Sequence, residues 1–248
     1  MYECEPRVSI VVPVYNEGES IVGCLDRLLS AVTLPCEVMV VYDSPEDTTA
    51  PHVEAYAERD SRVRPTLNTY GRGPARAIRF GMEHAAAPVV VLTMADGSDD
   101  VHQIDELAAL VQQGAAVAAA SRYMKGGRQI GGPALKRSLS RAAGLSLCWL
   151  ARVGTHDATN SFKAYSRDFI HEAGIESDAG FEVGIELVSK ARRMGLKVAE
   201  IPTTWRDRTE GASNFHLTAW IPRYLRWYWN ALDPRSRAEA PKVPADDR

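Results

Sequence analysis

Short apolar runs alternate with longer amphipathic stretches along the first half of the chain. The β-branched run at residues 8–14 predicts a buried strand, and residues 19–32 then place apolar side chains at helical intervals. This alternation continues to residue 121. It predicts strands at residues 37–42, 63–67, 89–93 and 116–121, and helices at residues 49–59, 74–86 and 101–113. Such alternation is typical of an α/β fold with a mostly parallel central sheet and helices on both faces.

The second half of the chain is less regular. Its pattern predicts a flexible loop at residues 126–132, a helix at 134–153, a strand at 162–165 and a helix at 182–194. Residues 199–202 are expected to lead out of a last strand. Glu182, Glu186 and Lys190 share one face of their helix, which favours a solvated row of charges. Residues 233–248 are charged, Pro-rich and without periodicity, so they indicate a disordered tail after a single domain at residues 1–232.

Composition and charge narrow the class of protein. The 248 residues are 45% hydrophobic and 25% charged, as in ordinary globular proteins. A net charge of −3 argues against a nucleic-acid-binding protein, which is usually basic. Scattered cysteines indicate free thiols in a reducing compartment. No apolar stretch approaches the roughly 20 residues that span a bilayer. We therefore expect a cytoplasmic protein, or one peripheral on the cytoplasmic face of a membrane.

Carboxylates follow the buried strand at residues 89–93. Asp96, Asp99 and Asp100 lie where a parallel sheet binds its ligands, and they repel one another unless a cation or solvent screens them. Oxygen ligands of this kind suit a hard divalent ion that bridges two phosphates. Helix capping is the alternative, because Asp99 can also cap the helix that begins near residue 101.

The ends of the first two strands also carry groups suited to a nucleotide. Pro13, Tyr15 and Glu17 lie at the end of the first strand, in a turn that resembles the nucleoside-binding turn of a known family named below. Tyr15 offers a ring, and Glu17 can accept hydrogen bonds from a base or ribose. Asp43 follows the second strand and either contacts base or ribose or is a simple turn residue. Arg72 lies in a Gly-x-Gly turn, which either holds phosphate through backbone N–H groups or is a tight turn with a solvated arginine.

Five fragments occur together in an order that resembles family 2 glycosyltransferases of the GT-A fold, especially the polyprenyl- and dolichyl-phosphate sugar synthases. They are VPVYNE at residues 12–17, Asp43, MADGSDD at 94–100, SRYMKGG at 121–127 and RDRTEGAS at 206–213. The resemblance covers roughly residues 8–214. It implies a nucleotide-sugar-binding fold and inverting, metal-assisted transfer of a sugar from a GDP- or UDP-sugar to a polyprenyl or dolichyl phosphate.

The resemblance further implies Mg²⁺ or Mn²⁺ at Asp96 and Asp99. Met94 departs from the family, because it stands where the Asp-x-Asp motif has its first carboxylate. Tyr42 likewise replaces the first carboxylate of the Asp-Asp pair that Asp43 completes. These departures leave the ligand set of the metal open.

Arginines at three positions of the resembled family hold the donor and acceptor phosphates. They correspond to Arg122, Arg137 and Arg208, and guanidinium forks suit phosphate oxygens. A solvated basic face is the alternative for each. Asn214 replaces the lysine that the family commonly has after Arg-x-x-Gly-x-Ser. Asp157 corresponds to a residue that positions the acceptor or acts as a base, with a hydrogen-bonded turn as the alternative.

Residues 217–232 carry Trp220, Tyr224 and Trp227 at helical spacing among arginines. This amphipathic segment is suited to a membrane surface, where a lipid phosphate acceptor would lie. A helix packed on the domain and a seam between two copies are the alternatives. A lipid phosphate is already anionic and needs no general base, whereas a hydroxyl acceptor needs one, for which Asp157 is the candidate.

Two other functions stay open from the sequence. One is a soluble glycosyltransferase acting on a hydroxyl of a glycan or small molecule. The other is a nucleotide-sugar-binding module that has lost catalysis, which Met94 and Tyr42 favour. A dinucleotide oxidoreductase is disfavoured, because no Gly-x-Gly-x-x-Gly follows the first strand.

Overall fold

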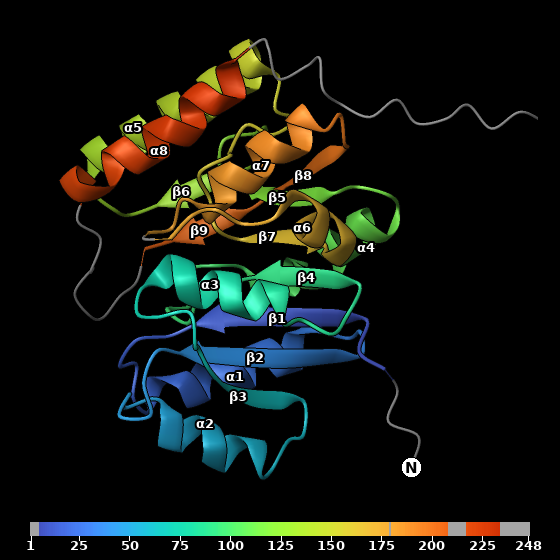
Figure 1. Ribbon diagram of the computed structural model, residues 1–248, viewed down its shortest axis with the longest axis vertical. Coiled ribbons are helices and arrows are strands. Elements are labelled where there is room, and N and C mark those ends of the chain that lie inside the picture. Colours follow the sequence, from blue (N-terminus) through green and yellow to red (C-terminus); the bar gives the residue numbers. More distant parts are fainter. Residues whose placement is uncertain (1–4, 179, 208–216, 234–248) are drawn as a thin grey trace, which may run out of the picture.

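The computed structural model describes residues 5–178, 180–207 and 217–233. Their centre is a seven-stranded sheet with the order β3-β2-β1-β4-β7-β5-β8 (Figure 1). Its strands are β1 (Val8–Pro13), β2 (Cys36–Tyr42), β3 (Val63–Leu67), β4 (Val89–Leu92), β5 (Val117–Ser121), β7 (Lys163–Ser166) and β8 (Val198–Pro202). β7 runs antiparallel to β4 and β5, and the other pairs are parallel. The predicted α/β fold with a mostly parallel sheet is confirmed.

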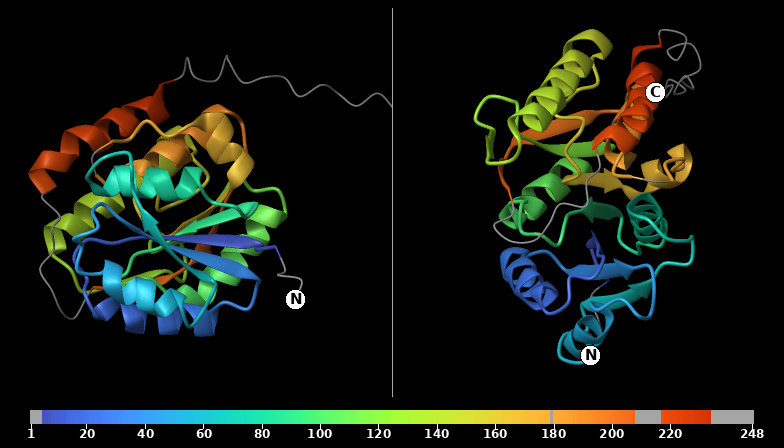
Figure 2. Two further views of the ribbon diagram at one scale, coloured as in Figure 1. Left: turned by 60° about the horizontal axis from the view of Figure 1, so that its bottom comes forward. Right: turned by 90° about the vertical axis from the view of Figure 1, so that its left-hand side faces the viewer.

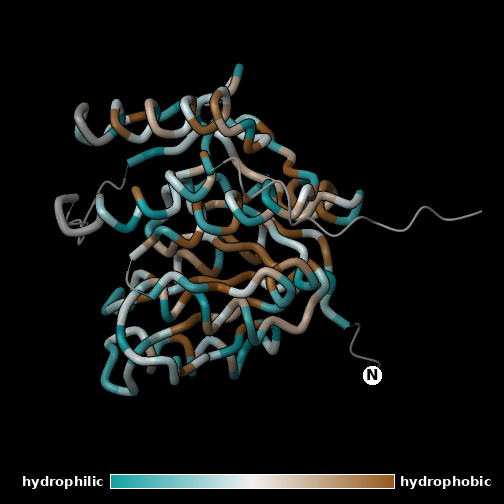
Figure 3. Tube along the Cα trace, turned by 45° about the horizontal axis from the view of Figure 1, so that its top comes forward, coloured by the Kyte–Doolittle hydropathy of each residue, from teal (hydrophilic) through white to brown (hydrophobic). Residues whose placement is uncertain are grey.

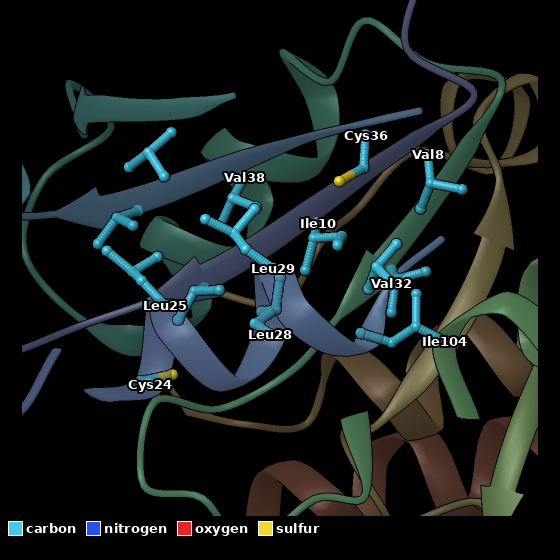
Figure 4. Close-up of a cluster of buried hydrophobic side chains, with 14 of the residues drawn as sticks. Val8, Ile10, Cys24, Leu25, Leu28, Leu29, Val32, Cys36, Val38 and Ile104 are labelled. Atoms are coloured by element: carbon cyan, nitrogen blue, oxygen red, sulfur yellow. The ribbon is translucent and has the colours of Figure 1, made fainter. Parts of the chain in front are cut away.

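Helices cover both faces of the sheet, as Figure 2 shows. They are α1 (Ser20–Ala31), α2 (Ala50–Ala57), α3 (Pro74–Glu83), α4 (Ile104–Gln112), α5 (Ala134–Ser146), α6 (Arg167–Ala173), α7 (Val183–Arg193) and α8 (Leu217–Leu232). Side chains alternate between the two faces of a strand. Ile10 therefore packs with α1 and α4, while its neighbour Val11 packs with α3 on the opposite side. Figure 4 shows Ile10 among Leu25, Leu28 and Leu29 of α1.

The uninterrupted apolar runs of the sequence form the inner strands, which are fully buried in β1, β2 and β4. They appear as the hydrophobic centre of the trace in Figure 3. Parallel strands covered on both faces require such runs, because neither face meets water. In the described part of the chain, no helix combines the length and the apolar character needed to cross a membrane.

Residues 126–132 are not a flexible loop throughout, which corrects the sequence-based prediction. They contain β6 (Arg128–Ile130), which pairs with β9 (Thr204–Arg206) in a second small sheet. The partner strand is more than 70 residues away in the sequence, so local composition carried no sign of the pairing. The helix predicted at residues 134–153 is α5 followed by a π-helical turn at Leu147–Ala151.

The charged row on α7 is buried rather than solvated, so this second prediction was wrong. The Glu186 carboxylate accepts hydrogen bonds from the backbone N–H groups of Glu176 and Ser177 at 2.7 and 2.9 Å, and it pairs with Lys190 at 2.8 Å. Glu182 is also buried. The reason is tertiary, because α6 and α8 pack on the α7 surface that an isolated helix would expose.

Candidate active site

A cavity of about 790 Å³ opens at the carboxyl ends of β1, β2, β4 and β5. Parallel strands bring their ends to one edge of a sheet, and this edge is where α/β folds bind ligands. The cavity is lined by eight of the residues singled out from the sequence: Pro13, Tyr15, Glu17, Asp43, Arg72, Asp96, Asp99 and Arg122. Groups scattered over more than 100 positions therefore meet in one place.

The turn after β1 is held in shape by Asp47, which sequence reasoning missed. Both carboxylate oxygens of Asp47 accept from the backbone N–H of Asn16 at 3.1 Å, and Glu17 N–H donates to Thr49 Oγ1 at 3.0 Å. Asn16 has φ of 54°, a left-handed conformation that asparagine tolerates better than most residues. This fixed turn lets Tyr15 line the cavity instead of continuing the strand.

Asp43 fastens a second loop to the same edge. One carboxylate oxygen accepts from Asn68 Nδ2 at 2.8 Å and the other from Gly73 N–H at 2.7 Å. The loop between these two residues carries Arg72, and Gly73 has φ of 124°, which favours glycine. Asp43 is thus more than a local turn residue, because it positions Arg72 beside the cavity.

Asp99 is a partly buried carboxylate beside a second carboxylate. Burial raises the pKa of Asp99 to about 6, and the negative charge of Asp96 adds to the rise. Thr93 Oγ1 and Met94 N–H donate to Asp99 at 3.0 and 3.2 Å, which orients it. The capping role considered for Asp99 belongs to its neighbour Asp100, which accepts from His102 N–H at 3.3 Å. The helix-cap alternative is therefore unnecessary for Asp99.

The two carboxylates fit a hard divalent ion. A like-charged neighbour and burial both oppose ionisation of Asp99, and a cation between the carboxylates would relieve both effects. Within the described ranges, no three His, Cys, Asp or Glu side chains gather into a metal site. Mg²⁺ commonly takes one or two carboxylates and completes its shell with water and substrate phosphates. Met94 lines the cavity, but its thioether is a poor ligand for such an ion.

Arg122 and Asp157 form a buried ion pair. Arg122 Nε donates to Asp157 Oδ2 at 2.7 Å and Nη2 donates to Oδ1 at 2.9 Å, with 9% of the Arg122 side chain and 0% of the Asp157 side chain exposed. Burial alone would raise the pKa of Asp157, but the charge and hydrogen bonds of Arg122 hold it below its usual value. Arg122 Nη2 also donates to Ser140 and Thr159.

Asp157 is not among the described residues that line the cavity. A general base must reach the proton that it removes. Asp157 instead has both oxygens engaged by Arg122 and no exposed surface. In this geometry the Asp157 carboxylate orients Arg122, and its part in catalysis stays a prediction. Arg137 is exposed on α5 and is also absent from the lining, and Arg208 lies outside the described residues.

The far end of the cavity is apolar. It is lined by side chains of three helices: Leu139 and Ala143 of α5, Ile185 of α7, and Tyr224, Leu225 and Tyr228 of α8, together with Phe181. α5 and α8 lie side by side in Figures 1 and 2. Tyr228 Oη donates to Ser146 Oγ at 2.9 Å and joins their ends. The site thus changes from carboxylates and arginine at the strand ends to hydrocarbon between the helices.

Trp227 belongs to the core rather than to a surface. It is 3% exposed, and Lys190 Nζ lies 5.3 Å from its ring centroid. The helix-packing alternative therefore holds for Trp227, while Trp229 on the same helix is 64% exposed. The side chain of Trp220 lies outside the described part of the structure.

Comparison with known proteins gives consistent matches. The model of glycosyl transferase family 2 matches residues 9–174. Undecaprenyl-phosphate mannosyltransferase of Micrococcus luteus is 28% identical over 213 residues, covering 84% of this chain and 86% of that protein. Polyprenol monophosphomannose synthase of Mycolicibacterium smegmatis is 29% identical over 213 residues, covering 84% and 80%.

Solved structures share the GT-A fold. A mannosyltransferase from Pyrobaculum calidifontis, in complex with GDP-Man and Mn²⁺, superposes with a TM-score of 0.63 at 21% identity and covers 91% of this chain and 64% of that one. Glucosyl-3-phosphoglycerate synthase from Mycobacterium tuberculosis, in complex with Mn²⁺ and UDP, gives 0.63 at 18% identity, with 96% and 81% covered. At these identities the likeness concerns the fold.

Proposed function

The chain belongs to glycosyl transferase family 2, and we propose that it transfers a sugar from a nucleoside diphosphate sugar to a polyprenyl phosphate. The observation that carries this proposal is the single cavity with two chemically different ends. A nucleotide sugar suits the carboxylates and arginine at the strand ends, and an isoprenoid chain suits the apolar end between α5 and α8. The names of the two bacterial relatives, which specify polyprenyl phosphate acceptors, support the same choice.

The donor end is assigned from the strand outward. Tyr15 and Glu17 contact the nucleoside, and Arg72 lies near its phosphates. Asp96 and Asp99 would hold Mg²⁺ or Mn²⁺, and the bound ion would offset the charge of the diphosphate as it leaves. The Mn²⁺ in the related solved structures supports a divalent ion.

The acceptor phosphate is assigned to Arg122 and Ser140, which both line the cavity and are hydrogen-bonded to each other. An oxygen of the lipid phosphate attacks the anomeric carbon of the sugar. The bond from that carbon to the diphosphate breaks, its electron pair leaves with the nucleoside diphosphate, and the configuration inverts. The attacking oxygen is already anionic, so no proton needs to be removed. Asp157 holds Arg122 in place, and Arg208 remains a candidate for the same phosphates.

The same assignment gives the protein a membrane-facing side. Large apolar side chains are exposed on the π-helical turn after α5 and on α8: Trp149 at 72%, Leu150 at 68%, Leu225 at 44% and Trp229 at 64%. Tryptophan is well suited to the interface between water and lipid. We therefore place residues 1–232, as one catalytic domain, peripherally on the cytoplasmic face of a membrane, with these side chains toward the lipid.

Two experiments test this function. Purified protein with Mg²⁺ is incubated with GDP- or UDP-sugars and a short-chain polyprenyl phosphate, and mass spectrometry should detect the glycosylated lipid phosphate. Glycosylation of a water-soluble hydroxyl compound instead would contradict the acceptor assignment. In liposome flotation at low salt, Trp149→Ser with Trp229→Ser should weaken binding to anionic vesicles, whereas Tyr15→Ser, at the cavity, should not. Equal flotation of both variants would contradict the membrane-facing side.

A further inference from the structure

Strand β9 and the residue that follows it bring two side chains to the cavity, beside the turn that carries Asp96. Arg206 N–H donates to Ser98 O at 3.1 Å, so the strand lies directly against the turn that carries Asp96. Side chains alternate along a strand. Trp205 in the strand and Asp207 directly after it both line the cavity, whereas Arg206 between them is absent from the lining. Asp207 and Arg206 are exposed, and Trp205 is partly buried.

The position of this pair is fixed by the neighbouring strand β6. Asp207 N–H donates to Ile130 O at 2.9 Å. The two residues that follow, Gly131 and Gly132, have φ of 83° and 76°. A Cβ on Gly131 would lie 2.9 Å from Asp207 Cβ, and one on Gly132 would lie 3.8 Å from the Trp205 ring. Gly131 thus lets the strand pack this closely, and glycine at both positions permits the left-handed backbone.

The pair lies between the two groups that the reaction joins. The carboxylate turn at Asp96 is on one side through the bond of Arg206 to Ser98. On the other side, Arg122 Cζ lies 6.0 Å from the Trp205 ring centroid. The sugar must occupy this interval during transfer, because its anomeric carbon is bonded first to the donor diphosphate and then to the acceptor phosphate.

The chemistry of the pair matches a sugar. A pyranose has an apolar face of C–H groups, which suits an indole ring, and a rim of hydroxyl donors, which suits a carboxylate. Asp207 is exposed and lines the cavity, and no residue of the sequence analysis had been assigned to the sugar. The carboxylate is therefore available to a ligand.

We propose that Trp205 and Asp207 bind the sugar of the donor and select which sugar is transferred. Trp205 packs on its C–H face, and Asp207 accepts a hydrogen bond from one or two ring hydroxyls. A site built around such a hydrogen bond discriminates strongly against sugars that lack or misplace the hydroxyl. This inference rests on the proposed function, because it requires a nucleotide sugar in the cavity.

Calorimetry separates the sugar from the nucleotide. For Asp207→Asn and Trp205→Leu, we expect affinity for the free nucleoside diphosphate to stay within about twofold of wild type. Affinity for the nucleotide sugar should fall about tenfold, as the loss of one charged hydrogen bond predicts. Preference between epimeric nucleotide sugars should narrow in Asp207→Asn, and Trp205→Phe should restore part of the loss. Arg206→Ala, on the opposite face of β9, is the matched control and should bind both ligands as wild type does.

The outcomes separate this inference from the proposed function. Equal losses for the nucleotide and the nucleotide sugar would place the pair at the nucleotide and overturn the inference. A raised KM for the lipid phosphate with unchanged donor affinity would place the pair at the acceptor and overturn it as well. In both cases the transferase function stands. Wild-type protein that binds no nucleotide sugar would instead overturn the function, and the inference with it.

Discussion

Replacing Asp157 with alanine tests whether this residue positions Arg122 or acts as a general base. In the structure, the backbone N–H, Nε and Nη2 of Arg122 all donate to Asp157, at 2.7–3.0 Å. Asn160 N–H donates to the same carboxylate at 3.1 Å. Alanine would remove the carboxylate that accepts these bonds and leave the Arg122 guanidinium, 9% of whose side chain is exposed, without a counter-charge. The hydroxyls of Ser140 and Thr159 would still accept from its Nη2.

The expected cost follows from that burial. Removing one partner of a buried ion pair destabilises a protein by about 3–5 kcal/mol. In a chain of this size, 1 kcal/mol shifts the melting temperature by about 2–4 °C, so Asp157→Ala should lower it by about 6–20 °C. Asp157→Asn keeps one acceptor and the shape, and should cost about 1.5–3 kcal/mol. The double variant Arg122→Met with Asp157→Leu should recover most of the stability, because no buried charge is left unpaired.

Thermal unfolding and the pH dependence of sugar transfer are measured on the same variants. In the folded protein the pKa of Asp157 lies below its ordinary value, so the ionised carboxylate stabilises the fold above about pH 4. That stability is lost as the pH falls through the pKa of the folded state. The double variant should be stable but inactive, since it lacks the guanidinium for the acceptor phosphate. A normal melting temperature for Asp157→Asn, together with loss of the acidic limb of its pH–rate profile, would refute the positioning role and establish a general base.

Three further predictions concern the metal, a buried lysine and helix packing. Asp96→Ala should abolish most of the metal dependence of nucleoside diphosphate binding, and equal affinity of the wild type with and without EDTA would contradict a metal role. Burial lowers the pKa of Lys163 to about 7 in the folded protein. From pH 7 to about 10, Lys163 is therefore protonated in the unfolded chain and neutral in the folded one. The free energy of unfolding should rise with pH over this range, by at most about 1.4 kcal/mol per pH unit. Urea unfolding should show this rise in the wild type and not in Lys163→Met, and parallel curves would refute it. Gly81→Ala would bring a Cβ within 2.5 Å of Val11 and should lower the free energy of unfolding by about 1–3 kcal/mol. Gly23→Ala, with no contact closer than 3.7 Å, should raise it by about 0.5–1 kcal/mol. The reverse order of stability in urea unfolding would contradict the packing of α3 on β1.

Much of the fold and of the cavity could be predicted because both depend on local patterns. Apolar runs alternate with amphipathic helices, and that alternation determines that the strands are mostly parallel. Once the strands are parallel, groups that follow them, such as Glu17, Asp43 and Asp96, must meet at one edge. Eight of the candidate residues line the same cavity for this reason.

What the sequence left undetermined depends on partners that are distant in the chain. β6 exists because β9 pairs with it, and the sequence near Arg128 contains no sign of that strand. Glu186 is an exposed-looking charge on its own helix, but the loop at Glu176 and the packing of α8 bury it. Asp157 has the sequence context of an acceptor-binding residue, and only the structure shows that its carboxylate pairs with the buried Arg122 guanidinium.

A competition between a polyprenyl phosphate and the corresponding polyprenol as acceptors tests the central claim most directly. Purified protein receives one nucleotide sugar, Mg²⁺ and equal amounts of a short polyprenyl phosphate and of the same polyprenol without phosphate. The two acceptors share the apolar chain and differ only in the group assigned to Arg122 and Ser140. We predict that mass spectrometry finds sugar on the phosphate and none on the alcohol. Sugar on the alcohol, or equal amounts on both, would contradict the account.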